Sequence, residues 1–154
     1  MYAVALIVHS WNRWLVLASG IATLALVLRG LSAGKQWSRA DQRLALVFIS
    51  ALDVQAVLGL LLYLVLSPIV PKTIKELEVA MHVGALRFFA VEHITMMLLA
   101  LIVAHGAWSY AKRADNGRAR QRRVAWGFAL SLLLILSAIP WPWLAAGRPL
   151  FHWF

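Results

Sequence analysis

The stretch that decides the fold is Arg87–Arg113, which reads RFFAVEHITMMLLALIVAHGAWSYAKR. It is long and apolar enough to cross a bilayer, which takes about 20 mostly apolar residues in a helix. Three ionisable residues interrupt it: Glu92, His93 and His105. Such groups are costly to leave in lipid, so they normally face a bundle interior, a partner or a cofactor. The stretch therefore predicts a membrane helix that carries a polar site.

The composition of the whole chain also indicates a membrane protein. Of its 154 residues, 62% are hydrophobic and only 14% are charged, and the mean hydropathy is +0.77. The net charge of +9 comes from basic residues between apolar runs, so it indicates membrane topology and argues against nucleic-acid binding. Cysteine is absent, which excludes disulfides, thiolate metal sites and covalent haem attachment. A haem would need ligands such as His.

Four stretches qualify as spanning helices of a single domain: Val8–Arg29, Leu44–Leu66, Leu86–Tyr110 and Val124–Trp143. The first has no leading Lys or Arg and no small-residue cleavage site, so we expect a helix and not a signal peptide. The first and third connections are strongly basic, whereas lysines and glutamates balance in the second. The positive-inside rule then places both termini outside. We predict an all-α, up-down-up-down four-helix bundle in the bacterial cytoplasmic membrane.

Aromatic residues are expected at the outer membrane boundary: Trp11, Trp14, Phe88, Phe89, Trp141, Trp143 and Trp153. Pro140 and Pro142 are expected to break the chain after the fourth helix. The tail Gly147–Phe154 is too short for a fifth span and is expected along the outer surface. His82 and His152 are expected to be solvated or interfacial, because neither has a partner at metal-ligand spacing.

The first candidate site lies near the outer ends of the first and third helices. His9 and Arg13 lie one turn apart, and Glu92 and His93 lie at a similar depth. Two histidines at one level of a bundle suit axial ligation of a b-type haem, so His9 and His93 are the candidate metal ligands. Arg13 would neutralise a haem propionate or pair with Glu92. The alternatives are a structural cluster, with Glu92 paired to Arg13 or Arg87, and a quinone or pigment pocket.

A second level lies nearer the cytoplasm. Asp53 and His105 are expected to meet there as a buried acid–base pair, either structural or part of a proton path to a quinone. His93 and His105 are separated by about 18 Å along a helix and by a rotation of about 120°. The separation suits two stacked haems but the rotation does not. The facing helix also offers Asp53 and Gln55 in place of a second histidine ligand.

Four segments together resemble a group of small bacterial four-helix membrane proteins labelled cytochrome b-like: HSWNRWLVL (9–17), DVQAVLGLLLYLVLSP (53–68), RFFAVEHITMMLLA (87–100) and LILSAIPWPW (134–143). The resemblance runs along nearly the whole chain and implies a four-helix bundle. It also implies that His9, Arg13 and His93 occupy the polar positions of that group. Many members carry His where this chain has Asp53, so the resemblance implies no haem ligand at that position.

These patterns predict a cytochrome b-like electron-transfer or anchor protein that exchanges electrons with quinone or a partner redox subunit. It would work beside other membrane subunits or as a homo-oligomer. One alternative is a non-haem or pigment-binding accessory subunit of a respiratory or photosynthetic complex, in which one histidine ligates a chlorophyll magnesium. Another is a small transporter that uses Asp53 as a protonatable site. No phosphate-binding loop, nucleophile–base motif or metalloprotease signature is present.

Overall fold

The computed structural model describes residues 1–151. Every regular element in that range is a helix, so the prediction of an all-α chain is confirmed. The elements in chain order are α1 (Tyr2–Ser32), α2 (Arg39–Leu61), the π-helical turn η1 (Leu62–Leu66), α3 (Ile74–His82), α4 (Gly84–Arg87), the π-helical turn η2 (Phe88–Glu92), α5 (His93–Lys112) and α6 (Gly117–Ala138).

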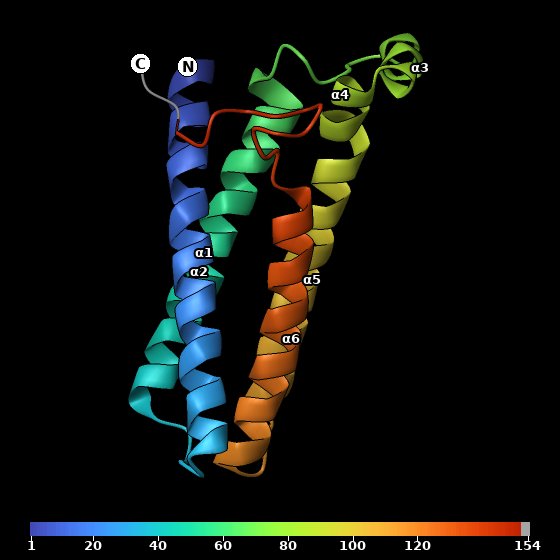
Figure 1. Ribbon diagram of the computed structural model, residues 1–154. Coiled ribbons are helices and arrows are strands. Elements are labelled where there is room, and N and C mark those ends of the chain that lie inside the picture. Colours follow the sequence, from blue (N-terminus) through green and yellow to red (C-terminus); the bar gives the residue numbers. More distant parts are fainter. Residues whose placement is uncertain (152–154) are drawn as a thin grey trace.

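Four long helical segments run side by side (Figure 1): α1, α2 with η1, α4 with η2 and α5, and α6. α1 packs mainly on α2, and α5 packs mainly on α6. The two pairs meet where α1 contacts α6 and where α2 contacts α5, so α1 and α5 lie diagonally across the shared core. Among the described residues, three segments are long and apolar enough to cross a membrane: Tyr2–Ser32, Arg39–Leu66 and Gly84–Lys112.

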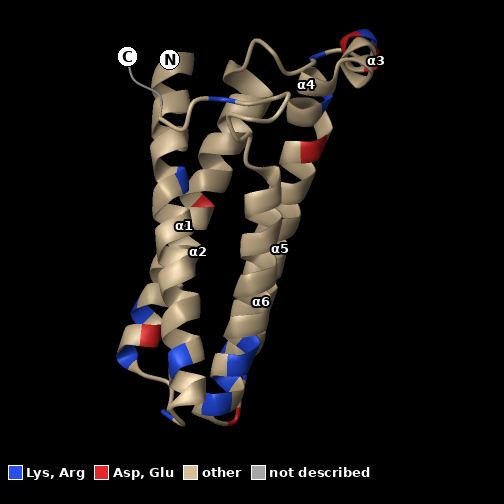
Figure 2. Cartoon of the chain, in the orientation of Figure 1, with Lys and Arg blue, Asp and Glu red and all other residues tan. Residues whose placement is uncertain are grey.

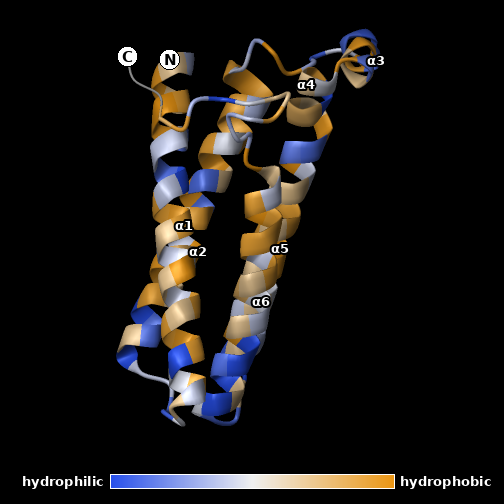
Figure 3. Ribbon diagram, viewed as in Figure 1, coloured by the Kyte–Doolittle hydropathy of each residue, from blue (hydrophilic) through white to orange (hydrophobic). Residues whose placement is uncertain are grey.

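The two ends of the helices differ in charge. Lys and Arg gather around the α1–α2 and α5–α6 connections (Figure 2), and we call this the basic end. The opposite end, which we call the tail end, carries the start of α1, the helix α3 and the segment that follows α6. Mostly apolar residues cover the helices between the two ends (Figure 3).

Side-chain caps set the starts of three helices, α2, α3 and α6. α2 begins at Arg39, five residues earlier than predicted, because Ser38 and Asp41 form a capping box. The Asp41 N–H donates to Ser38 Oγ (3.2 Å), and the Ser38 N–H donates to the Asp41 carboxylate (2.7 Å). Thr73 starts α3 in the same way, since its Oγ1 accepts from the Glu76 N–H (3.2 Å). The sequence had predicted no helix in that connection.

α6 differs most from its predicted range, Val124–Trp143. It begins at Gly117, where Asn116 caps the first turn, and it ends at Ala138. The prolines at 140 and 142 lack the N–H groups that would continue the helix. Arginines occupy the first turns, and the early end limits the apolar run after them to residues 124–138, which is shorter than a spanning helix needs. α6 is therefore not among the helices that are apolar and long enough to cross a membrane.

The π-helical turns were also not predicted, and they are joined to each other. In η2 the His93 N–H donates to the Phe88 carbonyl, five residues earlier. The hydroxyl of Tyr63 in η1 donates to the Ala90 carbonyl in η2 (2.8 Å). π-helical turns are often found at functional sites, because they reposition side chains relative to a regular helix. Here both lie at the tail end, and η2 directly precedes His93.

The hydrophobic core includes a pair of buried rings near the middle of the helices. Phe48 of α2 packs on Phe128 of α6 with ring centroids 4.7 Å apart, and both side chains are fully buried. Gly20 of α1 permits this close approach, because a Cβ there would lie 2.8 Å from the side chains of Phe48 and Leu132. All three contacting helices therefore meet tightly at this level.

Candidate functional site

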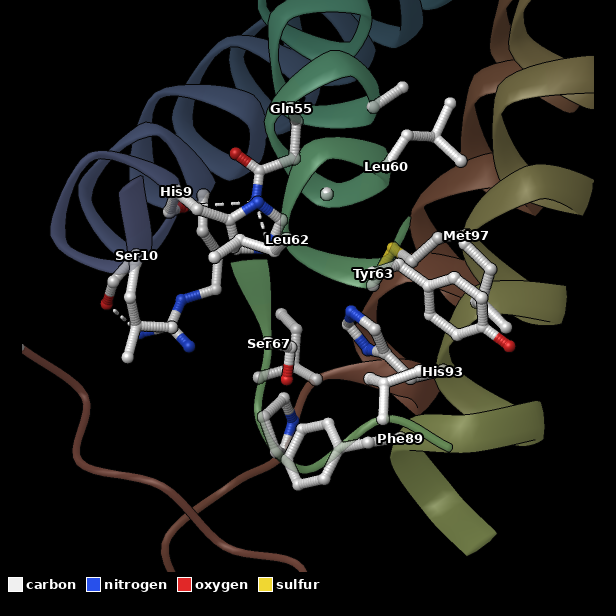
Figure 4. Close-up of a pocket in the computed structure, with 18 of the residues that line it drawn as sticks. His9, Ser10, Gln55, Leu60, Leu62, Tyr63, Ser67, Phe89, His93 and Met97 are labelled. Carbon is white, nitrogen blue, oxygen red and sulfur yellow. Dashed lines mark hydrogen bonds between the residues drawn. The ribbon is translucent and has the colours of Figure 1, made fainter. Parts of the chain in front are cut away.

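A cavity of about 160 Å³ lies at the tail end, between the α1–α2 pair and the α5–α6 pair. His9 and His93 line it (Figure 4). Arg13 also lines it, and most of the remaining wall is apolar. Leu60 and Leu98 also line it, and these side chains are 37% and 39% exposed. The cavity therefore opens to the outside of the molecule between α2 and α5.

His93 is held in one orientation by the end of α6. Its Nδ1 lies 2.7 Å from the Ala138 carbonyl oxygen, which can only accept, so Nδ1 carries the proton. That carbonyl is available because its partner in a continuing helix would be the N–H of residue 142, which is Pro142. Nε2 of the neutral ring is then left with a lone pair. Ligating histidines commonly donate their other N–H to a carbonyl in this manner.

The neighbouring proline frees a second carbonyl, which an aromatic residue satisfies. Pro140 cannot donate to the Leu136 carbonyl, and the indole Nε1 of Trp141 donates to it instead (3.0 Å). Trp141 also stacks on Trp143, with ring centroids 5.2 Å apart. The IPWPW segment thus ends α6, satisfies one freed carbonyl with its own indole and presents the other to His93.

His9 is fixed by an amide network on α1 and α2. Asn12 Nδ2 donates to Gln55 Oε1 (2.8 Å), which leaves the Gln55 amide nitrogen facing His9. That nitrogen lies 3.0 Å from the His9 carbonyl and 3.1 Å from His9 Nε2. Nε2 therefore accepts and Nδ1 carries the proton. Nδ1 is buried and has no hydrogen-bond partner among the described residues. Such an orphaned polar atom is uncommon in folded proteins.

The two imidazoles face each other across the cavity. Their ring centroids are 6.5 Å apart and their planes are inclined by 67°. With a metal–nitrogen bond of about 2 Å, two imidazoles on one metal ion have centroids about 6 Å apart. The observed spacing is close to that value. The sequence prediction that these histidines lie at one level agrees with this geometry.

Two guanidinium groups line the same cavity. Arg13 donates to the Leu150 carbonyl and lies 3.5 Å from Ser10 Oγ, while its buried Nε has no partner among the described residues. Arg148 lies over the ring of Phe89, at 5.2 Å from its centroid. The segment after α6 therefore folds back onto α1 and completes the cavity wall, whereas the sequence suggested that it runs along the outer surface.

Glu92 lies outside the cavity. It pairs with Arg87 at 2.8 Å, and both side chains are about half exposed. Of the two pairings that the sequence left open, the structure contains Arg87–Glu92 and not Arg13–Glu92. His82 lies in the last turn of α3 and is exposed, as expected. The expectations for His152 and Trp153 concern positions outside the described residues.

Asp53 and His105 meet, but not where they were expected. His105 Nε2 lies 2.7 Å from Asp53 Oδ1, and the two side chains are 45% and 49% exposed. The expectation of a buried pair was wrong: the pair lies on the outside of α2 and α5, and neither residue lines the cavity. Gln55 was grouped with Asp53 at the inner level, yet it bonds to His9 in the candidate site.

Sequence reasoning missed the contributions of Arg148 and Tyr63 to the cavity wall. It also missed the Ala138 carbonyl, although the two prolines signal it.

No family model, curated protein or solved structure matches the chain. Within residues 1–151, no group of three or more His, Cys, Asp or Glu side chains is placed to hold a metal ion. Two histidines suffice as axial ligands when a tetrapyrrole supplies the other four donors.

Proposed function

We propose that the chain is a four-helix membrane cytochrome of b type, which holds one haem between His9 and His93. The observation that carries this proposal is the pair of imidazoles 6.5 Å apart across a cavity on diagonal helices. His93 is oriented with a free Nε2, which suits ligation of a metal. His9 would become a ligand by giving up the Gln55 bond at its Nε2, because its buried Nδ1 carries the proton.

The remaining residues of the cavity fit the other parts of a haem. Arg13 and Arg148 would hold the two propionates, since guanidinium groups bind carboxylates well. The apolar walls would contact the macrocycle and exclude water from it. A tetrapyrrole is larger than the enclosed space, so it would extend into the opening between Leu60 and Leu98. When bound, the haem supplies a one-electron redox centre.

The same proposal places the chain in a bacterial cytoplasmic membrane, with the basic end inside and both termini outside. The arginines at the start of α6 would lie at the inner interface, and its apolar part would complete the bundle. The protein would exchange electrons with quinone or a partner redox subunit, because the described residues contain no further domain that could act on a soluble substrate.

The test is a reduced-minus-oxidised absorption spectrum of detergent-purified protein. We expect a sharp b-type α band that is lost in His93→Ala and in His9→Ala. The matched control is His82→Ala, which removes an exposed histidine of α3 and should leave the band unchanged. A wild-type protein that stays colourless after haem supplementation during expression contradicts the proposal.

A non-haem accessory subunit is the second candidate. The observation that favours it is the bond between the Gln55 amide and Nε2 of His9, which engages one imidazole without any metal. In that role the cavity would take a pigment or stay closed within a larger respiratory or photosynthetic complex. A colourless protein that co-purifies with membrane redox subunits would support it.

A further inference from the structure

The Asp53–His105 pair is the one ionisable cluster of the helices that the proposed haem site does not use and that lies far from either end. Asp53 is near the middle of Arg39–Leu66, and His105 is well inside Gly84–Lys112. In the proposed membrane placement, both half-exposed side chains face hydrocarbon. Ionisable groups at that depth are expensive unless a partner, a cavity or a ligand covers them.

The pair retains hydrogen-bonding capacity. Its one bond joins His105 Nε2 to Asp53 Oδ1, and no bond from a described residue reaches Oδ2 or Nδ1. The free Oδ2 is an acceptor, and the free Nδ1 is a donor or an acceptor according to the tautomer. The half-exposed pair therefore keeps two polar atoms that no described residue satisfies.

The pair and the cavity opening lie along the same contact between α2 and α5. We define this seam as the surface of the two helices from Asp53 and His105 to Leu60 and Leu98. Leu60 is seven residues beyond Asp53 on α2, about 10 Å along the helix. Leu98 is seven residues before His105 on α5, at a matching distance. Residues seven apart lie on nearly the same face of a helix, so the polar pair and the cavity wall share one face of α2 and one of α5.

We infer that this seam binds the ring of a lipid-soluble quinone, whose carbonyl or hydroxyl oxygens hydrogen-bond to Asp53 and His105. The inference rests on the proposed function and deepens it by locating the quinone on the lipid-facing seam instead of inside the bundle. Only binding is assigned to the pair. A ring bound there would be separated from the cavity by about two turns of helix, or about 10 Å.

The surroundings of the pair favour a small lipid-soluble ligand over another helix. Val54, Val57 and Ile102 flank it and are 49%, 67% and 66% exposed. Membrane helices pack on one another through small residues that permit close approach, whereas branched aliphatic residues of this size are typical of lipid-facing surfaces. A flat ring with polar oxygens at its edge could hydrogen-bond to the pair while its apolar faces contact these aliphatic side chains.

The test is photolabelling with a short-chain azidobenzoquinone, using the full chain in lipid nanodiscs and mapping labelled peptides by mass spectrometry. We expect label on residues 53–60 and 98–105, and competition by unlabelled short-chain quinone. Asp53→Asn and His105→Gln should each weaken competition about tenfold, the loss expected for one hydrogen bond to a charged group. The matched control is Glu92→Gln, which alters another half-exposed ion pair at the tail end and should change nothing.

Label elsewhere on the chain, or equal competition in Asp53→Asn and wild type, would overturn the inference. So would efficient thiol cross-linking of Ile102→Cys between two copies, because a second copy would then cover the seam. The chain contains no cysteine, which keeps that experiment free of background. The readout does not need a haem. A colourless protein that is labelled on the seam supports the quinone inference and contradicts the cytochrome proposal. A coloured protein without label on the seam supports the cytochrome proposal and contradicts the quinone inference.

Discussion

The core around Phe48 and Phe128 and the cavity at the tail end differ in how tightly their side chains pack. Near the middle of the helices, Phe48 and Phe128 are fully buried against each other, and Gly20 lets α1 approach Phe48 closely. At the tail end, His9 and His93 line a cavity with their ring centroids 6.5 Å apart. The apolar contacts of the first region supply the packing that stabilises the fold, which leaves the second region free to keep polar groups and a cavity.

A layer of polar and aromatic side chains seals the basic end. The Arg120 guanidinium lies 4.7 Å from the Trp37 ring centroid and 5.4 Å from that of Trp108, and it donates to Gln42 Oε1 (2.7 Å). Stacking of a cation on aromatic faces is worth about 0.5–2 kcal/mol per contact. Arg120 at this end thus contributes to packing through its stacking and its hydrogen bond.

The largest expected effect on stability comes from removing a large side chain from the core around Phe48 and Phe128. Phe48→Ala removes a fully buried ring and should lower the free energy of unfolding by about 3–5 kcal/mol. Phe89→Ala, the same change in the cavity wall, should cost less than half of that, because Phe89 is only partly buried. Thermal midpoints in one detergent measure both. Equal losses would show that the two regions contribute alike.

An intermediate effect, on haem affinity, is expected from a change that competes for the Ala138 carbonyl, which orients His93. Pro142→Ala restores an N–H that can bond to the Ala138 carbonyl and compete with His93. Haem affinity should fall about tenfold while the thermal midpoint of the haem-free protein changes little. Haem titration followed by absorbance measures this affinity. Pro68→Ala, after η1, is the control and should keep wild-type affinity; unchanged affinity in Pro142→Ala would contradict the role given to the carbonyl.

The smallest effect is expected at the turn between α1 and α2. Gly34 has φ of +65°, a conformation that costs a side-chain-bearing residue about 1 kcal/mol. Gly34→Ala should therefore lower stability by about that amount, without any change in the cavity. Gly84→Ala is the control at the tail end, since its φ is not positive and its Cβ would meet open space. A stability loss at Gly84 equal to that at Gly34 would refute the backbone explanation.

The helices were predictable because long apolar runs leave few alternatives, but their ends were not. The start of α2 depends on the reciprocal bonds of Ser38 and Asp41, which a hydropathy profile does not register. The end of α6 at Ala138 was signalled by the two prolines, and the same prolines predict free carbonyls four residues earlier. That signal was available from the sequence and leads directly to the partner of His93.

The polar residues were harder to place, because a sequence indicates depth along a helix better than it indicates the face. Asp53 and Gln55 are two residues apart, which on a helix is a rotation of about 200°. One therefore faces outward and the other faces His9. Arg148 was missed for a different reason. Its segment returns to α1 through the bond of Arg13 to Leu150, between residues 137 apart in sequence, and no local pattern reports such a contact.

The contact between α1 and the segment after α6 also affects when the cavity can form during synthesis. Arg13 and Trp14 both donate to the Leu150 carbonyl, so the cavity wall joins an early helix to a segment that leaves the ribosome more than a hundred residues later. The packing of α1 on α2 and of α5 on α6 can form while translation continues, but the site between the pairs cannot. Under the proposed function, a ligand would load only after the helices are in place. A chain truncated before Leu150 would lack a complete cavity wall.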